Sequence, residues 1–97
     1  MEIALRTRAP DDAEAANEVR AVLDSALRRE AALAAARRDY FASSCSAFEE
    51  RIKLSSEEFM RQFEAGTLGD DAEFFDWYAA KRGLDVWERR YRIVYGE

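Results

Sequence analysis

The stretch "LSSEEFMRQFEAGTLGDDAEF" (residues 54–74) decides the fold, because it contains the signals that begin one helix, end it and begin the next. Ser55 is a favourable N-cap, and Glu58 stands three residues later, as a capping box requires. Leu54 before the cap and Phe59 inside the helix stand where a hydrophobic staple packs. Together these four residues predict a helix that begins at Ser55.

The end of this helix and the start of the next are predicted by glycine and aspartate. Gly66 is typical of the left-handed residue that follows a helix C-terminus. Asp70 is a second candidate N-cap, and Glu73 three residues later would complete a second capping box. The stretch therefore predicts a short helix over residues 55–65, a tight turn, and another helix over residues 70–94.

Upstream of this stretch, residues 11–52 contain neither proline nor glycine and consist mostly of strong helix formers. Their apolar residues recur at spacings of three and four, which predicts one amphipathic helix. A continuous helix of about forty residues is roughly 60 Å long, which is about twice the diameter of a globule of this chain length. The helix therefore either breaks, with Ser43–Ser46 as the predicted point, or projects beyond the core. The apolar positions are Ala16, Val19, Leu23, Ala26, Leu27, Leu33, Ala34, Phe41, Cys45, Phe48 and Ile52.

The first nine residues differ from the rest of the chain. Ile3 and Leu5 alternate with mostly polar residues, which is the pattern of a short strand, and Pro10 ends any such element. A single strand here would need a pairing strand from another chain. We therefore expect an extended arm over residues 1–9 and an all-α single domain over residues 1–97, completed by dimerisation or by a partner.

The charge of the chain argues against direct nucleic-acid binding, and the lack of a long apolar run argues against a membrane span. The formal net charge is −5 at pH 7, which repels phosphate backbones. Residues 55–76 hold seven acidic residues and one basic residue, so the acid is concentrated in the middle of the chain. No apolar run has the length of a signal peptide or a membrane span, and the single cysteine, Cys45, allows no internal disulfide. These features predict a cytoplasmic protein.

No arrangement of residues predicts catalysis or metal binding. The chain has no histidine and one cysteine, which leaves zinc without ligands, and no segment has the alternating oxygen ligands of a calcium loop. Most acids of residues 55–76 suit the first turns of helices, where negative charge is favourable. Asp76, with Glu73 nearby among aromatic residues, is the one candidate for acid–base chemistry. We predict no cofactor, no metal and no enzymatic activity, with an Asp76-dependent enzyme as the weakest alternative.

The aromatic residues predict a binding surface instead. Nine of them lie between Phe59 and Tyr95, and aromatic side chains rimmed by charge are typical of interface anchors. The last helix carries two apolar stripes, one with Phe74, Trp77, Tyr78 and Leu84, the other with Phe75, Ala79, Val86 and Ile93. The short helix covers one stripe, and the other needs the long helix, a second copy or a different protein. The alternative reading is that all of these aromatic residues serve one intramolecular core. Arg37 falls on the spacing of the long helix's apolar stripe and either pairs with an acid of a partner or extends along apolar surface. The predicted partner-binding residues are Phe59, Phe63, Asp70, Asp71, Phe75, Asp76, Trp77, Tyr78 and Arg37.

The run over residues 55–83 resembles a segment of small archaeal and cyanobacterial proteins that form the antitoxin half of toxin–antitoxin pairs. The resemblance covers roughly residues 48–91, and members of that family also carry a long charged helix before the segment, as this chain does. The matching residues are Ser56, Glu58, Phe59, Phe63, Gly66, Gly69, Asp70, Asp71, Phe75 and Trp77. The resemblance implies a protein that binds and silences a toxin enzyme, often one that resembles ribonucleases or transfers nucleotides. No helix-turn-helix spacing is present, so direct DNA binding is not expected.

Two functional hypotheses follow. In the first, the protein is a non-enzymatic antitoxin whose aromatic surface docks on its cognate toxin, while Asp70, Asp71 and Asp76 face basic residues that normally hold RNA or nucleotide phosphate. In the second, the protein is a homodimeric, coiled-coil-like scaffold whose seam is the apolar stripe of residues 16–52, with no toxin partner.

Overall fold

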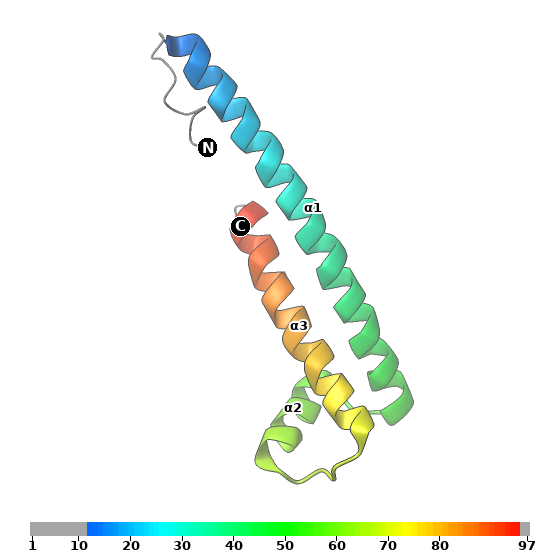
Figure 1. Ribbon diagram of the computed structural model, residues 1–97. Helices are drawn as coiled ribbons and strands as arrows, with labels where there is room; N and C mark the ends of the chain where they lie inside the picture. Colours follow the sequence, from blue (N-terminus) through cyan, green and yellow to red (C-terminus); the bar gives the residue numbers. More distant parts are fainter. Residues whose placement is uncertain (1–11, 96–97) are drawn as a thin grey trace.

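The computed structural model describes residues 12–95, and this part of the chain consists of three α-helices without strands (Figure 1). Helix α1 spans Asp12–Ile52, α2 spans Ser56–Ala65, and α3 spans Ala72–Tyr95. The predicted all-α fold and the order of a long helix, a short helix and a third helix are confirmed. The predicted arm over residues 1–9 lies outside the described residues.

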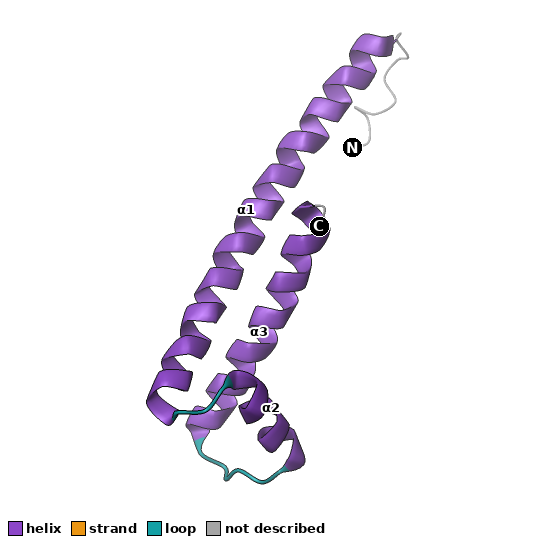
Figure 2. Cartoon of the chain, turned by 180° about the vertical axis from the view of Figure 1, so that it is seen from behind, coloured by secondary structure: helices purple, strands orange, loops and turns teal. Residues whose placement is uncertain are grey.

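The helices form an elongated hairpin rather than a globule. Helix α3 runs back alongside α1 in the opposite direction, and α2 lies across the end where the chain reverses (Figures 1 and 2). The molecule measures 64 × 22 × 18 Å with a radius of gyration of 20.7 Å, whereas a compact domain of this length has about 13 Å. Of the two predicted possibilities for the long helix, projection is therefore the one observed.

Helix α1 does not break at Ser43–Ser46. Ser44 lies within the helix and its hydroxyl donates a hydrogen bond to the Tyr40 carbonyl at 3.2 Å, a common way for serine to be accommodated in a helix interior. Cys45 is buried against the other helices. The helix therefore continues through Ser43–Ser46, because Ser44 forms a hydrogen bond within the helix and Cys45 packs into the core.

The turn from α1 to α2 is closed by Glu49. Its carbonyl accepts the backbone N–H of Lys53 at 2.8 Å, and its carboxylate accepts the backbone N–H of Ser56 at 2.9 Å. Lys53 takes the left-handed conformation, with φ of 62°. One side chain of α1 therefore satisfies a free donor at the start of α2.

The predicted start and end of α2 are confirmed. Ser55 is extended, and its hydroxyl accepts the Glu58 N–H at 3.0 Å. Gly66 is left-handed, and the N–H groups of Gly66 and Thr67 bond the carbonyls of Phe63 and Gln62, which is the Schellman pattern. The Glu58 carboxylate accepts hydrogen bonds from the side chains of Gln62 and Arg61 rather than from the Ser55 backbone N–H, so only the serine half of the predicted capping box forms. These two bonds, in that order, lower the pKa of Glu58.

The predicted start of α3 is wrong by one residue. The N-cap is Asp71 rather than Asp70, because the Asp71 carboxylate accepts the Glu73 N–H at 3.0 Å and its carbonyl accepts the Phe74 N–H at 3.0 Å. The Glu73 carboxylate pairs with Arg51 of α1 instead of closing a capping box. This tertiary ion pair explains the shift, and it ties the start of α3 to the end of α1.

The core lies where all three helices meet, at the end of the hairpin. Each helix contributes one ring to a stack centred on Trp77: Phe59 lies 4.0 Å from the Trp77 ring at an interplanar angle of 6°, and Phe48 lies 5.5 Å from it at 10°. Cys45 and Ala80 complete the buried cluster. The half-buried residues around it are Phe41, Phe48, Ile52, Leu54, Met60, Phe63, Leu68, Phe74, Tyr78 and Leu84.

Gly83 lies where α3 crosses closest to a ring of α1. A Cβ atom at this position would stand 2.8 Å from Cζ of Phe41. We therefore expect Gly83→Ala to destabilise the protein by about 1 kcal/mol, because the cost of overpacking exceeds the gain in helix propensity. In a Phe41→Ala background the same change should stabilise it by about 1 kcal/mol. Urea denaturation measures both, and stabilisation by Gly83→Ala alone would contradict the close contact.

Candidate functional site

Two residues predicted to bind a partner are core residues instead. Phe59 and Trp77 are both 0% exposed. The sequence places Phe59 on the inward face of the short helix, but helical spacing alone does not say which of the two apolar stripes of the last helix, that of Trp77 or that of Phe75, is covered. The position of α2 decides which stripe is covered, and α2 packs its Phe59 against the Trp77 side of α3. Neither residue is available to a partner while the chain is folded.

A buried polar contact accompanies this stack. The Trp77 indole N–H donates a hydrogen bond to the Ser56 hydroxyl at 2.9 Å, and the Ser56 residue is 2% exposed. Burial in the same place raises the pKa of the Cys45 thiol, which also contacts Ser56. The sequence identified Ser56 only as part of a helix start, so its role as the partner of the indole was missed.

The second predicted stripe of α3 faces outward and is uncovered. Phe75 is 55% exposed, Val86 50% and Ile93 63%, and Ala79 between them is exposed as well. Of these residues, Phe75 meets the ring of Phe63 from α2 at its edge, and all three large side chains remain at least half exposed. We call Phe75, Ala79, Val86 and Ile93 the outer row of α3.

Aromatic side chains of α2 and α3 pack together at the Phe75 end of the outer row. Phe63 stacks on Tyr78 with ring centroids 4.7 Å apart, and it meets Phe75 edge-on at 5.4 Å. Phe63 and Tyr78 are half-buried, so each also supports the core. These three predicted site residues are therefore brought together, and Phe75 is the one that offers most of its ring to solvent.

The acids of residues 55–76 divide into paired and unpaired groups. Glu57, Glu58 and Glu73 pair with Lys81, Arg61 and Arg51, respectively. Burial by itself lowers the pKa of Lys81, but the hydrogen bond and charge of Asp85, with the charge of Glu57, raise it overall, so this cation stays charged beside its acids.

The remaining acids are exposed and join none of the salt bridges found within residues 12–95. They are Glu64, Asp70, Asp71 and Asp76. One carboxylate oxygen of Asp71 accepts the Glu73 N–H and caps α3. Three of the predicted site residues thus leave an uncompensated negative charge around the end of the hairpin. We call the four residues Glu64, Asp70, Asp71 and Asp76 the acidic tip.

Arg37 lies away from the acidic tip and stacks on an aromatic ring. Its guanidinium carbon stands 5.0 Å from the Trp87 ring centroid, and that of Arg90 stands 5.2 Å from the same ring. Such cation–π contacts stabilise by about 0.5–1 kcal/mol when exposed. The structure therefore does not bring Arg37 together with the other predicted site residues.

A second uncovered apolar surface lies on the first half of α1, which extends beyond the end of α3 (Figures 1 and 2). Val19 is 51% exposed, Val22 64%, Leu23 56% and Leu27 50%. The predicted apolar stripe did not include Val22, although Val22 is three residues from Val19 and four from Ala26, which is helical spacing.

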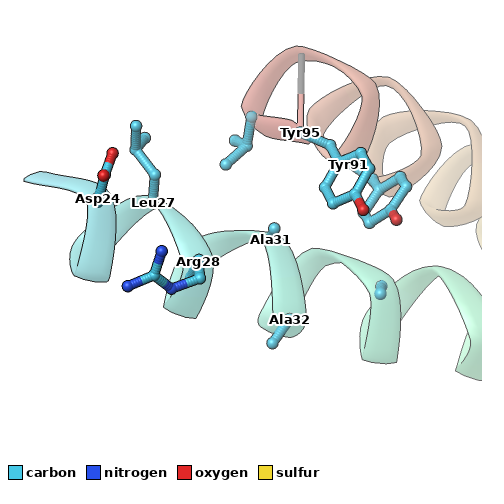
Figure 3. Close-up of a pocket in the computed structure, with 9 residues that line it drawn as sticks. Asp24, Leu27, Arg28, Ala31, Ala32, Tyr91 and Tyr95 are labelled. Carbon is cyan, nitrogen blue, oxygen red and sulfur yellow. The ribbon is translucent and has the colours of Figure 1, made fainter. Parts of the chain in front are cut away.

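The boundary between this surface and the covered part of α1 is an open groove of about 500 Å³. Leu27 and Asp24 lie beyond the last turn of α3, and Tyr91 and Tyr95 line the opposite side (Figure 3). The two tyrosine rings stack with centroids 5.1 Å apart. The groove is lined by Asp24, Leu27, Arg28, Ala31, Ala32, Ala35, Tyr91, Val94 and Tyr95.

Among residues 12–95 no group of three or more acidic or cysteine side chains is arranged to hold a metal ion. Over the same residues, no helix is both long enough and apolar enough to cross a membrane. Comparisons of the chain with protein-family models, with curated proteins and with solved structures found no match.

Proposed function

We propose that this protein is a non-enzymatic module that binds another protein through the outer row of α3 and the acidic tip. The observation that carries the proposal is the uncovered row itself, in which Phe75, Val86 and Ile93 are each at least half exposed on one face of one helix. Exposed apolar side chains gathered on one face can mark a protein–protein interaction site.

The two parts of the surface would contribute differently to binding. The outer row would supply affinity, because a partner that covers it removes apolar area from water. Phe75, held edge-on against Phe63, is a pre-organised aromatic anchor of the kind that dominates interface energetics. The acidic tip would guide a basic partner into place and raise the association rate.

We propose further that the partner is a toxin enzyme and that this chain is its antitoxin. The support is the resemblance of residues 56–77 to antitoxins, together with the unpaired carboxylates Asp70 and Asp76. An enzyme that acts on RNA or nucleotides carries basic residues for phosphate, and the acidic tip would neutralise such a site by occupying it.

The test is co-expression with the product of the adjacent gene, read out as growth rescue and as affinity in a pull-down. We expect a Phe75→Ala, Asp76→Ala variant to bind at least about 10-fold more weakly and to lose the rescue. Tyr40→Ala is the matched control, because Tyr40 is an exposed aromatic residue (66%) that lies on α1 and belongs to neither part of the proposed surface. Unchanged binding by the α3 variant would refute this surface, and an adjacent product without effect on growth would refute the antitoxin role.

A further inference from the structure

The first half of α1 continues a row that α3 covers further along the same helix. Ala34, Phe41 and Cys45 face α3 and the core, and at the same helical spacing the row continues to Leu27, Leu23 and Ala16. Beyond Tyr95 no described helix remains to cover it (Figures 1 and 2). The uncovered surface is therefore an extension of an existing helix–helix interface, and it fits another helix.

The length of the uncovered segment also defines its occupant. Residues 12–27 make about four and a half turns, or roughly 24 Å of helix. A helix that continues the existing interface would have a similar length, would begin where α3 ends, and would run in the direction of α3, antiparallel to α1. The same segment of a second chain meets each of these conditions.

The sequence of this segment is symmetric in a way that favours such pairing. Four of its apolar residues, Ala16, Val19, Leu23 and Ala26, form the seam, are spaced three, four and three apart, and read small, large, large, small. Leu27 follows them and lines the groove beside α3. Both the spacing and the order of sizes are the same when read backwards. In an antiparallel pair, each seam residue therefore lies opposite a seam residue of similar size from the other copy. A two-fold symmetric (isologous) interface requires such self-complementarity.

We propose that two copies of this chain form an antiparallel dimer through the first half of α1. In this dimer Val19 packs against Leu23 of the partner subunit, and Ala16 packs against Ala26 of the partner subunit. Val22 lies close to the two-fold axis. The first turn of each α1 reaches the level of Leu27 of the partner subunit, at the mouth of the groove beside Tyr95.

The dimer leaves the outer row of α3 and the acidic tip free, so it is independent of the proposed function. The acidic tip lies around the start of α3 at the other end of the hairpin, and the outer row extends along α3 from Phe75 to Ile93 (Figure 1). A dimer would present two such surfaces, one at each end, and would bind two partner molecules.

The test is the mass of the full chain in solution, measured by sedimentation equilibrium up to high micromolar concentration. We expect twice the monomer mass of 11.1 kDa. Leu23→Arg should weaken self-association by at least about 100-fold, because the symmetry places the change twice in the interface. Val86→Arg, on the outer row of α3, should leave the dimer intact. A monomer at every concentration, or a dimer that Leu23→Arg does not weaken, would overturn the proposal.

Single cysteines test the direction of pairing, in a Cys45→Ala background that removes the native thiol. Val22→Cys should form a disulfide-linked dimer on oxidation, because the two copies of residue 22 approach each other near the axis. Val19→Cys should not, because residue 19 faces Leu23 of the partner subunit. Efficient cross-linking through residue 19 alone would show a parallel pair and overturn the antiparallel arrangement.

Discussion

Replacing Trp77 with alanine is expected to destabilise the protein by about 3–5 kcal/mol. The side chain is fully buried and shares a ring stack with Phe48 of α1 and Phe59 of α2. Its removal would leave a cavity at the one place where all three helices touch. Small domains are stable by about 5–15 kcal/mol in total, so the variant would lose a large part of its folding free energy.

Denaturant unfolding followed by circular dichroism measures this effect. Ile93→Ala is the control on the same helix, because Ile93 is 63% exposed and surface changes shift stability by about 0.5 kcal/mol or less. If Trp77→Ala and Ile93→Ala cost the same, Trp77 is not the centre of the core, and the partner-binding role predicted for it from the sequence would return.

Ser56→Ala is expected to destabilise the protein by about 1–3 kcal/mol, because it leaves the Trp77 indole N–H buried without an acceptor. The hydroxyl that it removes lies 2.9 Å from that nitrogen. In a Trp77→Phe background the same substitution should cost much less, because the donor is already gone. The difference between the two costs is the coupling between the two side chains.

Ser55→Ala separates this effect from the general cost of disturbing the start of α2. It removes the N-cap hydroxyl, which should cost about 1 kcal/mol, equally in the Trp77 and Trp77→Phe backgrounds. An equal cost of Ser56→Ala in both backgrounds would mean that Ser56 acts only through the helix start.

The sequence predicted those features correctly whose hydrogen-bond partners are close to each other in the chain. The cap at Ser55 and the left-handed Gly66 follow from hydrogen bonds that span a few residues. The choice of Asp71 over Asp70 was not accessible in this way, because the Arg51–Glu73 pair joins residues of two helices. Judged by N-cap preference alone, Asp70 and Asp71 are equally suitable as the first residue before the helix.

The candidate site was predictable in part, for a similar reason. Helical spacing separated the stripe of Phe75, Val86 and Ile93 from that of Trp77, and the structure keeps them apart. Spacing alone does not say which stripe meets the rest of the chain. That depends on where α2 packs after the turn at Gly66, and Trp77 and Phe59 were consequently assigned to the surface.

The elongated outline of a single chain has a practical consequence for any study of its assembly. A globular protein with a radius of gyration of 20.7 Å would have on the order of 350 residues, several times the 97 present. Frictional drag follows dimensions rather than mass, so one rod-shaped chain elutes from a sizing column well ahead of a compact protein of equal weight. Column retention would thus suggest an oligomer even for a lone chain, and only methods that weigh the particle distinguish the two.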